Sequence, residues 1–197
     1  MDLEKAGVKY NHKGITISKT LQTSNSDIYA VGDCVEGPKF THASGSDARL
    51  VLRNALFMGS ADRSKVPMPY CTYTVPEVAK VGMNEQELQA NGIKYDVYAK
   101  SFGHNDRAIC DSKHGLYKVY CKAGTDTILG ATLVGGPAGD LISMITSAMQ
   151  NNTGLNAMGG IVHPYPTYVE AFKAMADDYN RTRLKPMVKS VIRKVFF

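Results

Sequence analysis

The chain of 197 residues is 44% hydrophobic and 21% charged, which is the composition of an ordinary globular protein able to bury a sizeable core. No segment approaches the apolar run of about 20 residues that a membrane span needs. The formal net charge is +5, and the six basic residues from Arg181 onward, where no acid occurs, account for it. A basic surface confined to one end is not typical of nucleic-acid binding, so we expect no nucleic-acid partner.

The spacing of the cysteines tests for a metal site, and the first residues test for a targeting signal. The four cysteines, Cys34, Cys71, Cys110 and Cys121, are far apart and form no CxxC pair or Cys/His cluster. We therefore expect reduced thiols and no metal site. Residues 1–14 are polar and charged, unlike a secretory signal or a transit peptide, which favours a cytoplasmic location.

Two strands are predicted near the start of the chain. Residues 14–18 alternate between apolar and polar side chains, as a strand with one buried face does. Residues 28–31 form a compact apolar run that ends on Gly32 and Asp33. A parallel strand of this kind delivers a carboxylate to the carboxyl edge of a sheet, where ligands bind.

A helix and a domain boundary follow. Apolar residues recur at near-helical spacing over residues 41–57, and Gly59 ends the pattern. The next stretch, residues 60–69, is polar and contains two prolines, which neither pack nor pair well in regular structure. We therefore expect residues 1–66 to form a first domain.

The second predicted domain, residues 67–182, has the alternation of an antiparallel sheet. Its predicted strands are 70–74, 95–99, 116–121 and 127–134. Asn84 followed by Glu87 is the N-cap signal of a helix between the first two strands. Two more helices are predicted, one from Pro137 and one over residues 167–180. Together these elements predict an α+β fold.

Residues 23–33, Thr-Ser-Asn-Ser-Asp-Ile-Tyr-Ala-Val-Gly-Asp, resemble the second flavin fingerprint of the pyridine nucleotide-disulfide oxidoreductases. In that family the strand that ends in Gly-Asp presents the carboxylate to a ribityl hydroxyl of FAD. Glycine permits close backbone approach, and a carboxylate accepts strongly from a hydroxyl. The resemblance implies that Gly32 and Asp33 bind FAD, and the alternative is a strand followed by an Asp-containing turn.

Residues 40–43, Phe-Thr-His-Ala, open the predicted helix, where the positive end of the helix dipole stabilises negative charge. In the same family, backbone groups at this place meet the pyrimidine edge of the flavin ring. The resemblance implies that Thr41 and His42 are flavin neighbours, mainly through the main chain. An ordinary threonine N-cap is a second interpretation, and the two are compatible because the cap creates the donors.

The second domain resembles the dimerisation domain of this family over its whole length. Residues 74–82, 129–131 and 138–140 carry the resemblance. The resemblance implies that the protein is a homodimer. It also implies that the chain consists of the C-terminal piece of an FAD/NAD(P)-binding α/β domain followed by a dimerisation domain of an antiparallel sheet plus helices. Glu77, in the first of these stretches, is interpreted as a surface or interface carboxylate and not as a catalytic acid.

Residues 163–171, His-Pro-Tyr-Pro-Thr-Tyr-Val-Glu-Ala, carry the most informative resemblance. In lipoamide dehydrogenases and glutathione reductases the corresponding motif has a histidine before Pro-Thr and a glutamate five positions after it, and this pair reaches the partner subunit's disulfide as a proton relay. Here the two positions are Tyr165 and Glu170, which the resemblance assigns as catalytic residues. Mercuric reductases also have tyrosine at this place, so the resemblance points to a mercuric-reductase-like branch.

The exchange of imidazole for phenol changes the chemistry available. An imidazole titrates near pH ~6.5 and exchanges protons at neutral pH, whereas a phenol with a pKa of about 10 mostly donates a hydrogen bond or contacts a metal. Efficient dithiol–disulfide exchange is thus disfavoured. His163 as a displaced base is a weaker hypothesis, because it lies two positions earlier. Glu170 has a second interpretation, since Thr167 and Glu170 form a capping box for the last helix.

The redox-active CxxxxC and the GxGxxG loops of the family have no counterpart in this sequence. The resemblance therefore implies that the sequence begins partway through the family's domain architecture and that the NAD(P)H-binding loops are not in this chain. The vicinal cysteine pair that ends mercuric reductases is also absent. The expected function is a flavoenzyme that passes electrons from NAD(P)H through FAD to a disulfide, a metal ion or another small acceptor. The alternatives are a free-standing dimerisation module and a dihydrolipoamide dehydrogenase- or glutathione reductase-like disulfide reductase.

Residues 183–197 form a basic tail with an apolar stripe at helical spacing after Pro186. Such a helix would make weak contact with an anionic membrane surface. Packing on the protein or fraying of the tail is the favoured alternative.

Overall fold

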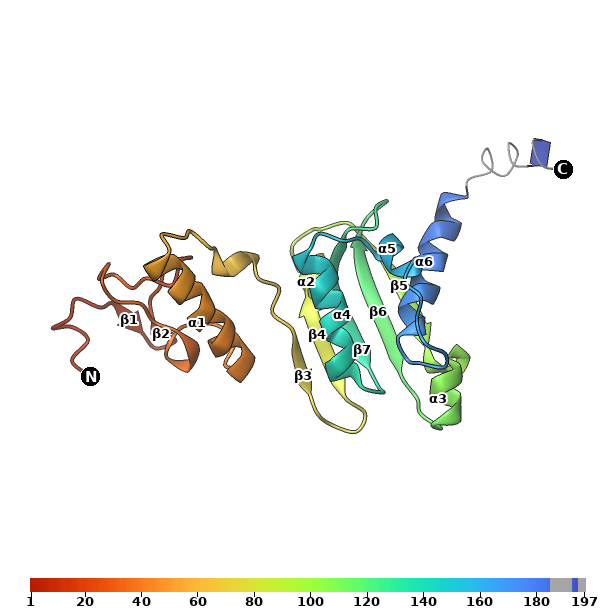
Figure 1. Ribbon diagram of the computed structural model, residues 1–197, viewed down its shortest axis with the longest axis horizontal. Coiled ribbons are helices and arrows are strands. Elements are labelled where there is room, and N and C mark those ends of the chain that lie inside the picture. The colour runs from red at the N-terminus through yellow and green to blue at the C-terminus, as the bar shows by residue number, and fades with distance from the viewer. Residues whose placement is uncertain (185–192, 195–197) are drawn as a thin grey trace. The chain divides into compact units, whose positions relative to one another are not determined.

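The structure is a computed structural model that describes residues 1–184, 193 and 194 (Figure 1). The chain divides into two compact units, Met1–Val66 and Pro67–Phe197, called unit 1 and unit 2 below. Most of the predicted basic tail, residues 183–197, lies outside the described residues. Within the described part of the chain, no helix has the length and apolar character needed to cross a membrane.

Unit 1 contains one long helix and little strand. β1 (Tyr10–Asn11) and β2 (Gly14–Ile15) form an antiparallel hairpin, so the strand predicted over residues 14–18 is shorter than expected. The predicted helix over residues 41–57 is confirmed as α1 (Thr41–Leu56). Unit 1 also has two 3-10 turns, η1 (Gly32–Cys34) and η2 (Arg63–Lys65).

The predicted parallel strand at residues 28–31 is wrong. This segment pairs locally and antiparallel, because the N–H of Thr23 donates to the carbonyl of Ile28 at 2.9 Å and the N–H of Ala30 donates to the carbonyl of Leu21 at 3.1 Å. A short apolar run has the same pattern in a buried sheet strand and in a segment folded back on its neighbour. The residues that follow therefore enter the η1 turn from a local loop, not from a described sheet.

Unit 2 is built on a five-stranded antiparallel sheet with the strand order β3-β4-β7-β6-β5, which confirms the predicted sheet type. The strands are β3 (Tyr70–Thr72), β4 (Val78–Gly82), β5 (Tyr95–Ser101), β6 (Leu116–Lys122) and β7 (Ile128–Val134). The sequence does not predict β4, in which a charged residue, Lys80, is buried at the centre. An ion pair of 2.5 Å with Glu87 compensates the burial of this charge.

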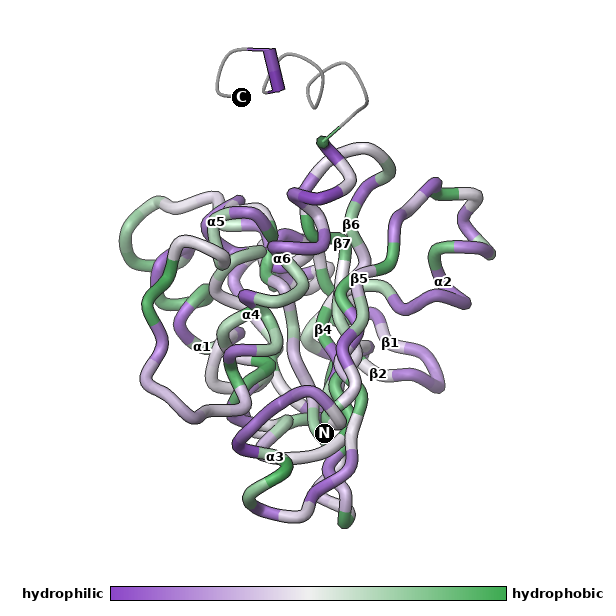
Figure 2. The backbone as a smooth tube through the Cα atoms, turned by 90° about the vertical axis from the view of Figure 1, so that its right-hand side faces the viewer, coloured by the Kyte–Doolittle hydropathy of each residue, from purple (hydrophilic) through white to green (hydrophobic). Residues whose placement is uncertain are grey.

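Helices cover one face of this sheet. α4 (Ala138–Gln150) packs on β4 and β7, α6 (Glu170–Arg183) packs on β5, and α5 (Leu155–Gly159) packs against α6. Figure 2 shows these three helices on one side of the strands and α2 (Glu85–Ala90) on the other. The core between sheet and helices is contributed by apolar residues of all these layers, among them Tyr117, Val119, Leu133, Ile145, Phe172 and Met175.

The sequence predicts the starts of some helices of unit 2 and misses others. The capping box predicted for α2 is confirmed, because Asn84 accepts from the N–H of Glu87 at 2.9 Å and Glu87 accepts from the N–H of Asn84 at 2.8 Å. α6 begins at Glu170 and not at residue 167 as predicted. The sequence does not predict α5 or α3 (Asp106–Cys110), because five residues are too few to display a helical period.

Candidate functional site

Gly32 and Asp33 lie in the η1 turn of unit 1. Gly32 is buried and has a φ of +75°, a left-handed conformation that residues with side chains rarely adopt. A Cβ at this position would lie 2.9 Å from the Oγ of Ser44 on α1. Asp33 is exposed, so its carboxylate is accessible to a ligand that donates from a hydroxyl group.

The N-terminus of α1 follows this turn in the chain. Phe40 is the N-cap and its side chain forms no cap hydrogen bond; Thr41 is the first helical residue and not the predicted N-cap. His42 is exposed and its ring stacks on that of Phe40, with centroids 5.2 Å apart. Because the first turn contains no acidic residue, it presents the positive end of the helix dipole to a polar ligand.

The loop between η1 and α1 is held by two basic side chains. Lys39 donates from Nζ to the carbonyl of Asp33. Arg63 donates to the carbonyl of Glu36 at 3.0 Å and to the carboxylate of buried Asp47 at 2.9 Å. The turn that carries Asp33 is therefore held in place by contacts within unit 1.

Tyr165 lies in the loop before α6 of unit 2, and 71% of its surface is exposed. Its hydroxyl donates a hydrogen bond of 2.6 Å to the carboxylate of Asp106, the first residue of α3. This hydrogen bond, together with the negative charge of Asp106, raises the pKa of Tyr165 above its ordinary value. The phenol is therefore protonated at neutral pH and is a poor general base.

Glu170 contacts the main chain of its own loop. Its Oε2 accepts from the N–H of Thr167 at 3.0 Å, whereas the hydroxyl of Thr167 donates to the carbonyl of Pro164 at 2.9 Å. Only half of the capping box predicted for Thr167 and Glu170 is thus formed. α6 begins at Glu170, which is half-buried.

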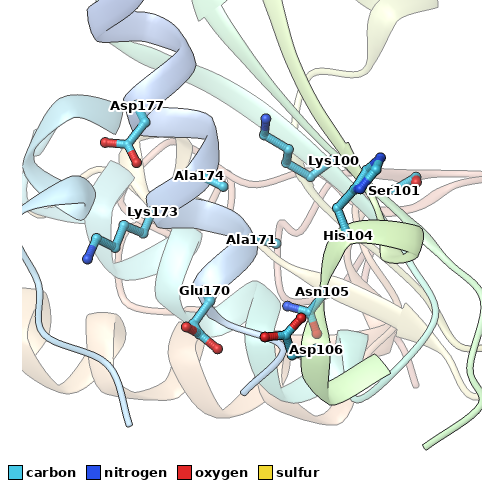
Figure 3. A pocket seen from close by; sticks show the side chains of 10 residues that line it. All are labelled: Lys100, Ser101, His104, Asn105, Asp106, Glu170, Ala171, Lys173, Ala174 and Asp177. Atoms are coloured by element: carbon cyan, nitrogen blue, oxygen red, sulfur yellow. The ribbon is translucent and has the colours of Figure 1, made fainter. Parts of the chain in front are cut away.

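Glu170 and Asp106 line one pocket of about 400 Å³ (Figure 3). The close-up shows Glu170 on α6 and Asp106 on α3 at facing walls of this pocket. The charged or titratable residues that line it are Lys100, His104, Asp106, Glu170, Lys173 and Asp177. The structure therefore brings Glu170 close to the partner of Tyr165, but the phenol bonds to Asp106 and not to Glu170.

The remaining predicted candidates lie apart from this pocket. His163 is not among the residues that line it, and its buried Nε2 has no hydrogen-bond partner among the described residues. Glu77 accepts from the N–H of Gly139 at 2.9 Å, in the first turn of α4. This contact gives Glu77 a structural role at a helix N-terminus.

Asn105 and Asp106 are the residues that the sequence interpretation overlooks. Buried Asn105 caps α3 by accepting from the N–H of Ala108 at 3.0 Å, and it donates to the carbonyl of Thr167 at 3.0 Å. The available signal is the Asn-Asp pair at residues 105 and 106, because Asn is a favoured N-cap and Asp is favoured in the first turn of a helix. No local pattern indicates that this helix start contacts the loop of Tyr165.

The described residues include no group of three His, Cys, Asp or Glu side chains able to hold a metal ion. The four cysteines are free thiols.

Comparison with known families identifies the class of protein. The family "Pyridine nucleotide-disulphide oxidoreductase, dimerisation domain" matches residues 68–176, and "Pyridine nucleotide-disulphide oxidoreductase" matches residues 1–48. The chain belongs to the pyridine nucleotide-disulphide oxidoreductase family. The match to the dimerisation domain lies within unit 2.

Individual relatives agree with this assignment. Dihydrolipoyl dehydrogenase 2, mitochondrial, from Arabidopsis thaliana is 34% identical over 179 residues, which are 89% of this chain and 35% of the relative. Dihydrolipoyl dehydrogenase from Thermus scotoductus is 33% identical over 179 residues, which are 90% of this chain and 38% of the relative. This chain thus spans about a third of the length of the curated relatives it matches.

A solved structure shows the same fold. The HOCl-induced flavoprotein disulfide reductase RclA from Escherichia coli aligns with a TM-score of 0.80 at 23% identity, covering 90% of this chain and 41% of that one.

The relatives named above are dihydrolipoyl dehydrogenases, so they establish the family but not the mercuric-reductase-like branch expected from Tyr165.

Proposed function

We propose that this chain is part of a homodimeric FAD-dependent oxidoreductase that passes electrons from NAD(P)H through FAD to a disulfide, a metal ion or another small acceptor. The observation that carries the proposal is the arrangement around Asp33. An exposed carboxylate follows a left-handed glycine and precedes the N-terminus of α1, whose first turn contains no acidic residue. These are the groups that a cofactor with hydroxyl groups and an electron-accepting ring requires.

The residues of unit 1 fit FAD. Asp33 would accept from a ribityl hydroxyl, and the first turn of α1 at Thr41 and His42 would face the pyrimidine edge of the ring. Gly32 supports this fit because it leaves the backbone without a side chain beside the carboxylate. When bound, FAD supplies the electron transfer, while this part of the chain orients the cofactor and favours negative charge near the helix N-terminus.

We propose that unit 2 pairs two subunits and brings Tyr165 to the active site of the partner. The family match to a dimerisation domain supports this assignment. Exposed apolar side chains support it too, since Val162 is 93% exposed and Tyr165 is 71% exposed in the same loop. Apolar surface of this kind on a folded unit is typical of a contact with another protein chain.

We propose that the protein belongs to the mercuric-reductase-like branch of the family. In this branch the residue at position 165 is not a histidine that could act as a general base toward the electron acceptor. The pKa of Tyr165 is raised by Asp106, which supports a role other than proton exchange at neutral pH. The dihydrolipoyl dehydrogenase relatives favour the competing proposal of a dithiol–disulfide reductase. The two proposals differ in whether a general base is needed at this position.

One observation favours a different function, a dimerisation module without activity. The core cluster of unit 2 consists entirely of residues from Cys71 onward, so this unit has its own hydrophobic core. A unit of this kind could fold and pair without a cofactor. Flavin content separates this alternative from the enzyme.

The test is to isolate the endogenous protein with an antibody raised against this chain and to measure its visible absorbance and the FAD released on heating. We expect about one FAD per subunit. Flavin-free protein that still pairs through unit 2 would overturn the enzyme proposal and favour the module. As a control, protein isolated with an antibody against an unrelated non-flavin protein should release no FAD.

A further inference from the structure

We propose that Asp106 is the positioning residue of Tyr165, and that the phenol presents its oxygen as a hydrogen-bond acceptor to the group it meets in the partner subunit. The inference rests on the proposed function, which brings Tyr165 to that site. Its basis is the hydrogen bond of 2.6 Å from the phenol to the Asp106 carboxylate. Because the single phenolic proton is committed to Asp106, only lone pairs are left for an approaching ligand.

Asp106 takes the place that the family resemblance assigns to Glu170. Glu170 accepts from the N–H of Thr167 at the start of α6, so its carboxylate is used to shape the loop. The phenol points instead to a helix 59 residues upstream. Tyr165 and Asp106 therefore form the pair at this position, with Glu170 on the facing wall of the pocket (Figure 3).

The segment from Asn105 to Asp111 forms a cradle for the loop of Tyr165. Asn105 donates to the carbonyl of Thr167 at 3.0 Å, and Tyr168 donates to the Asp111 carboxylate at 2.8 Å. With the bond between Tyr165 and Asp106, three hydrogen bonds join the two segments. An aromatic side chain with most of its surface exposed is thereby held in one orientation before any partner arrives.

Several charged groups near Tyr165 affect the pKa of its hydroxyl. Asp106 and Cys110 act on Tyr165 from α3, and Glu170 acts from α6. Lys100 and Lys173 line the same pocket from β5 and α6. Among the described residues, Asp106 is the group of this set that forms a hydrogen bond with the phenol. It therefore has the largest effect on the orientation of the Tyr165 side chain and on the pKa of its hydroxyl.

The ligand class follows from this arrangement. A phenol oxygen whose proton is already donated accepts from a thiol S–H or a bound water, or contacts a cation. It does not donate to a thiolate or to a carbonyl unless the bond to Asp106 breaks. The group that meets Tyr165 in the assembled protein is therefore a hydrogen-bond donor or a positive ion.

The experiment is an NMR titration of the full chain labelled with ¹³C at the tyrosine Cζ. Tyr165→Phe identifies the resonance of Tyr165. We expect Asp106→Asn to lower the pKa of Tyr165, because the negative charge is removed while the amide oxygen still accepts the hydrogen bond. Asp106→Glu should retain the raised pKa, and Asp106→Ala should also move the Cζ shift at neutral pH to that of an exposed tyrosine.

Two matched controls are available in the same cradle. Asp111→Asn should shift the resonance of Tyr168 and leave that of Tyr165 in place, because Asp111 bonds to Tyr168. Glu170→Gln should shift Tyr165 by less than Asp106→Asn does. A larger effect of Glu170→Gln, or no effect of Asp106→Asn, would overturn the inference. The outcome is separate from the flavin measurement, since the titration needs no cofactor.

Discussion

The side-chain amide of Asn105 donates to the main-chain carbonyl of Thr167 at 3.0 Å, although 62 residues separate them. Asn105 is 6% exposed, and its oxygen accepts from the N–H of Ala108 at the start of α3. One buried side chain therefore satisfies a helix N-terminus and a loop carbonyl together. The position of the Tyr165 loop depends on this residue as well as on Asp106.

Asn105→Ala should lower the free energy of unfolding by about 1–3 kcal/mol, because it leaves a buried N–H and a loop carbonyl without their partner. Urea unfolding followed by circular dichroism measures the change. Asn84→Ala is the matched control, since Asn84 caps α2 and forms no comparable long-range bond in the described structure. It should cost about 1 kcal/mol or less. Equal losses for the two variants would contradict the double role of Asn105.

Gly32→Ala should destabilise unit 1 by about 1–2 kcal/mol, because Gly32 has a φ of +75°. In the flavin-containing protein the variant should also release FAD more readily, measured as flavin fluorescence after dilution. Gly45→Ala on α1 is the control, since a Cβ there meets nothing within 4 Å. That control should be neutral or stabilise by up to about 1 kcal/mol. Equal effects of both variants would count against a special role for the Gly32 turn.

The ion pair of Glu87 and Lys80 should make stability depend on acid pH. Bonds from Lys80 and from the N–H of Asn84 lower the pKa of Glu87 below its ordinary value of 4.5. A lowered folded-state pKa stabilises the fold above the unfolded-state pKa, and this contribution is lost as the pH falls through the folded-state pKa. Thermal unfolding of Glu87→Gln should therefore depend less on pH below about 4.5 than that of the unaltered chain.

Glu85→Gln is the matched control for this pH prediction. Glu85 lies on the same helix, and its Oε2 is 3.8 Å from the Nζ of Lys118, a longer separation than that of the Lys80 pair. We expect its replacement to leave most of the acid dependence intact. A pH profile of Glu87→Gln that matches the unaltered chain would refute the assignment.

Tyr165→His should increase dithiol–disulfide turnover of the flavin-containing protein by about tenfold or more, because a placed general base contributes about 10²- to 10⁴-fold. Tyr165→Phe removes the phenol without adding a base and should give no increase. Steady-state rates with a dithiol substrate at neutral pH measure the difference. If both variants and the unaltered protein turn over dithiols equally, Tyr165 does not determine the acceptor.

The sheet of unit 2 could be predicted because its strands alternate and one face is buried, as the core position of Val119 and Leu133 illustrates. β4 could not, because the burial of Lys80 depends on Glu87 from another element. Similarly, Tyr165 was a candidate from its motif, whereas Asp106 was not. Its role arises from a contact between distant segments, which periodicity and local motifs do not encode.

Pairing of two subunits through unit 2 is the central claim, and sedimentation velocity of the chain with and without FAD tests it most directly. The account predicts a species of twice the chain mass of 21.4 kDa at micromolar concentration, independent of FAD, and a shift toward monomer in Val162→Asp. A single monomeric species at every concentration, with and without FAD, would contradict it.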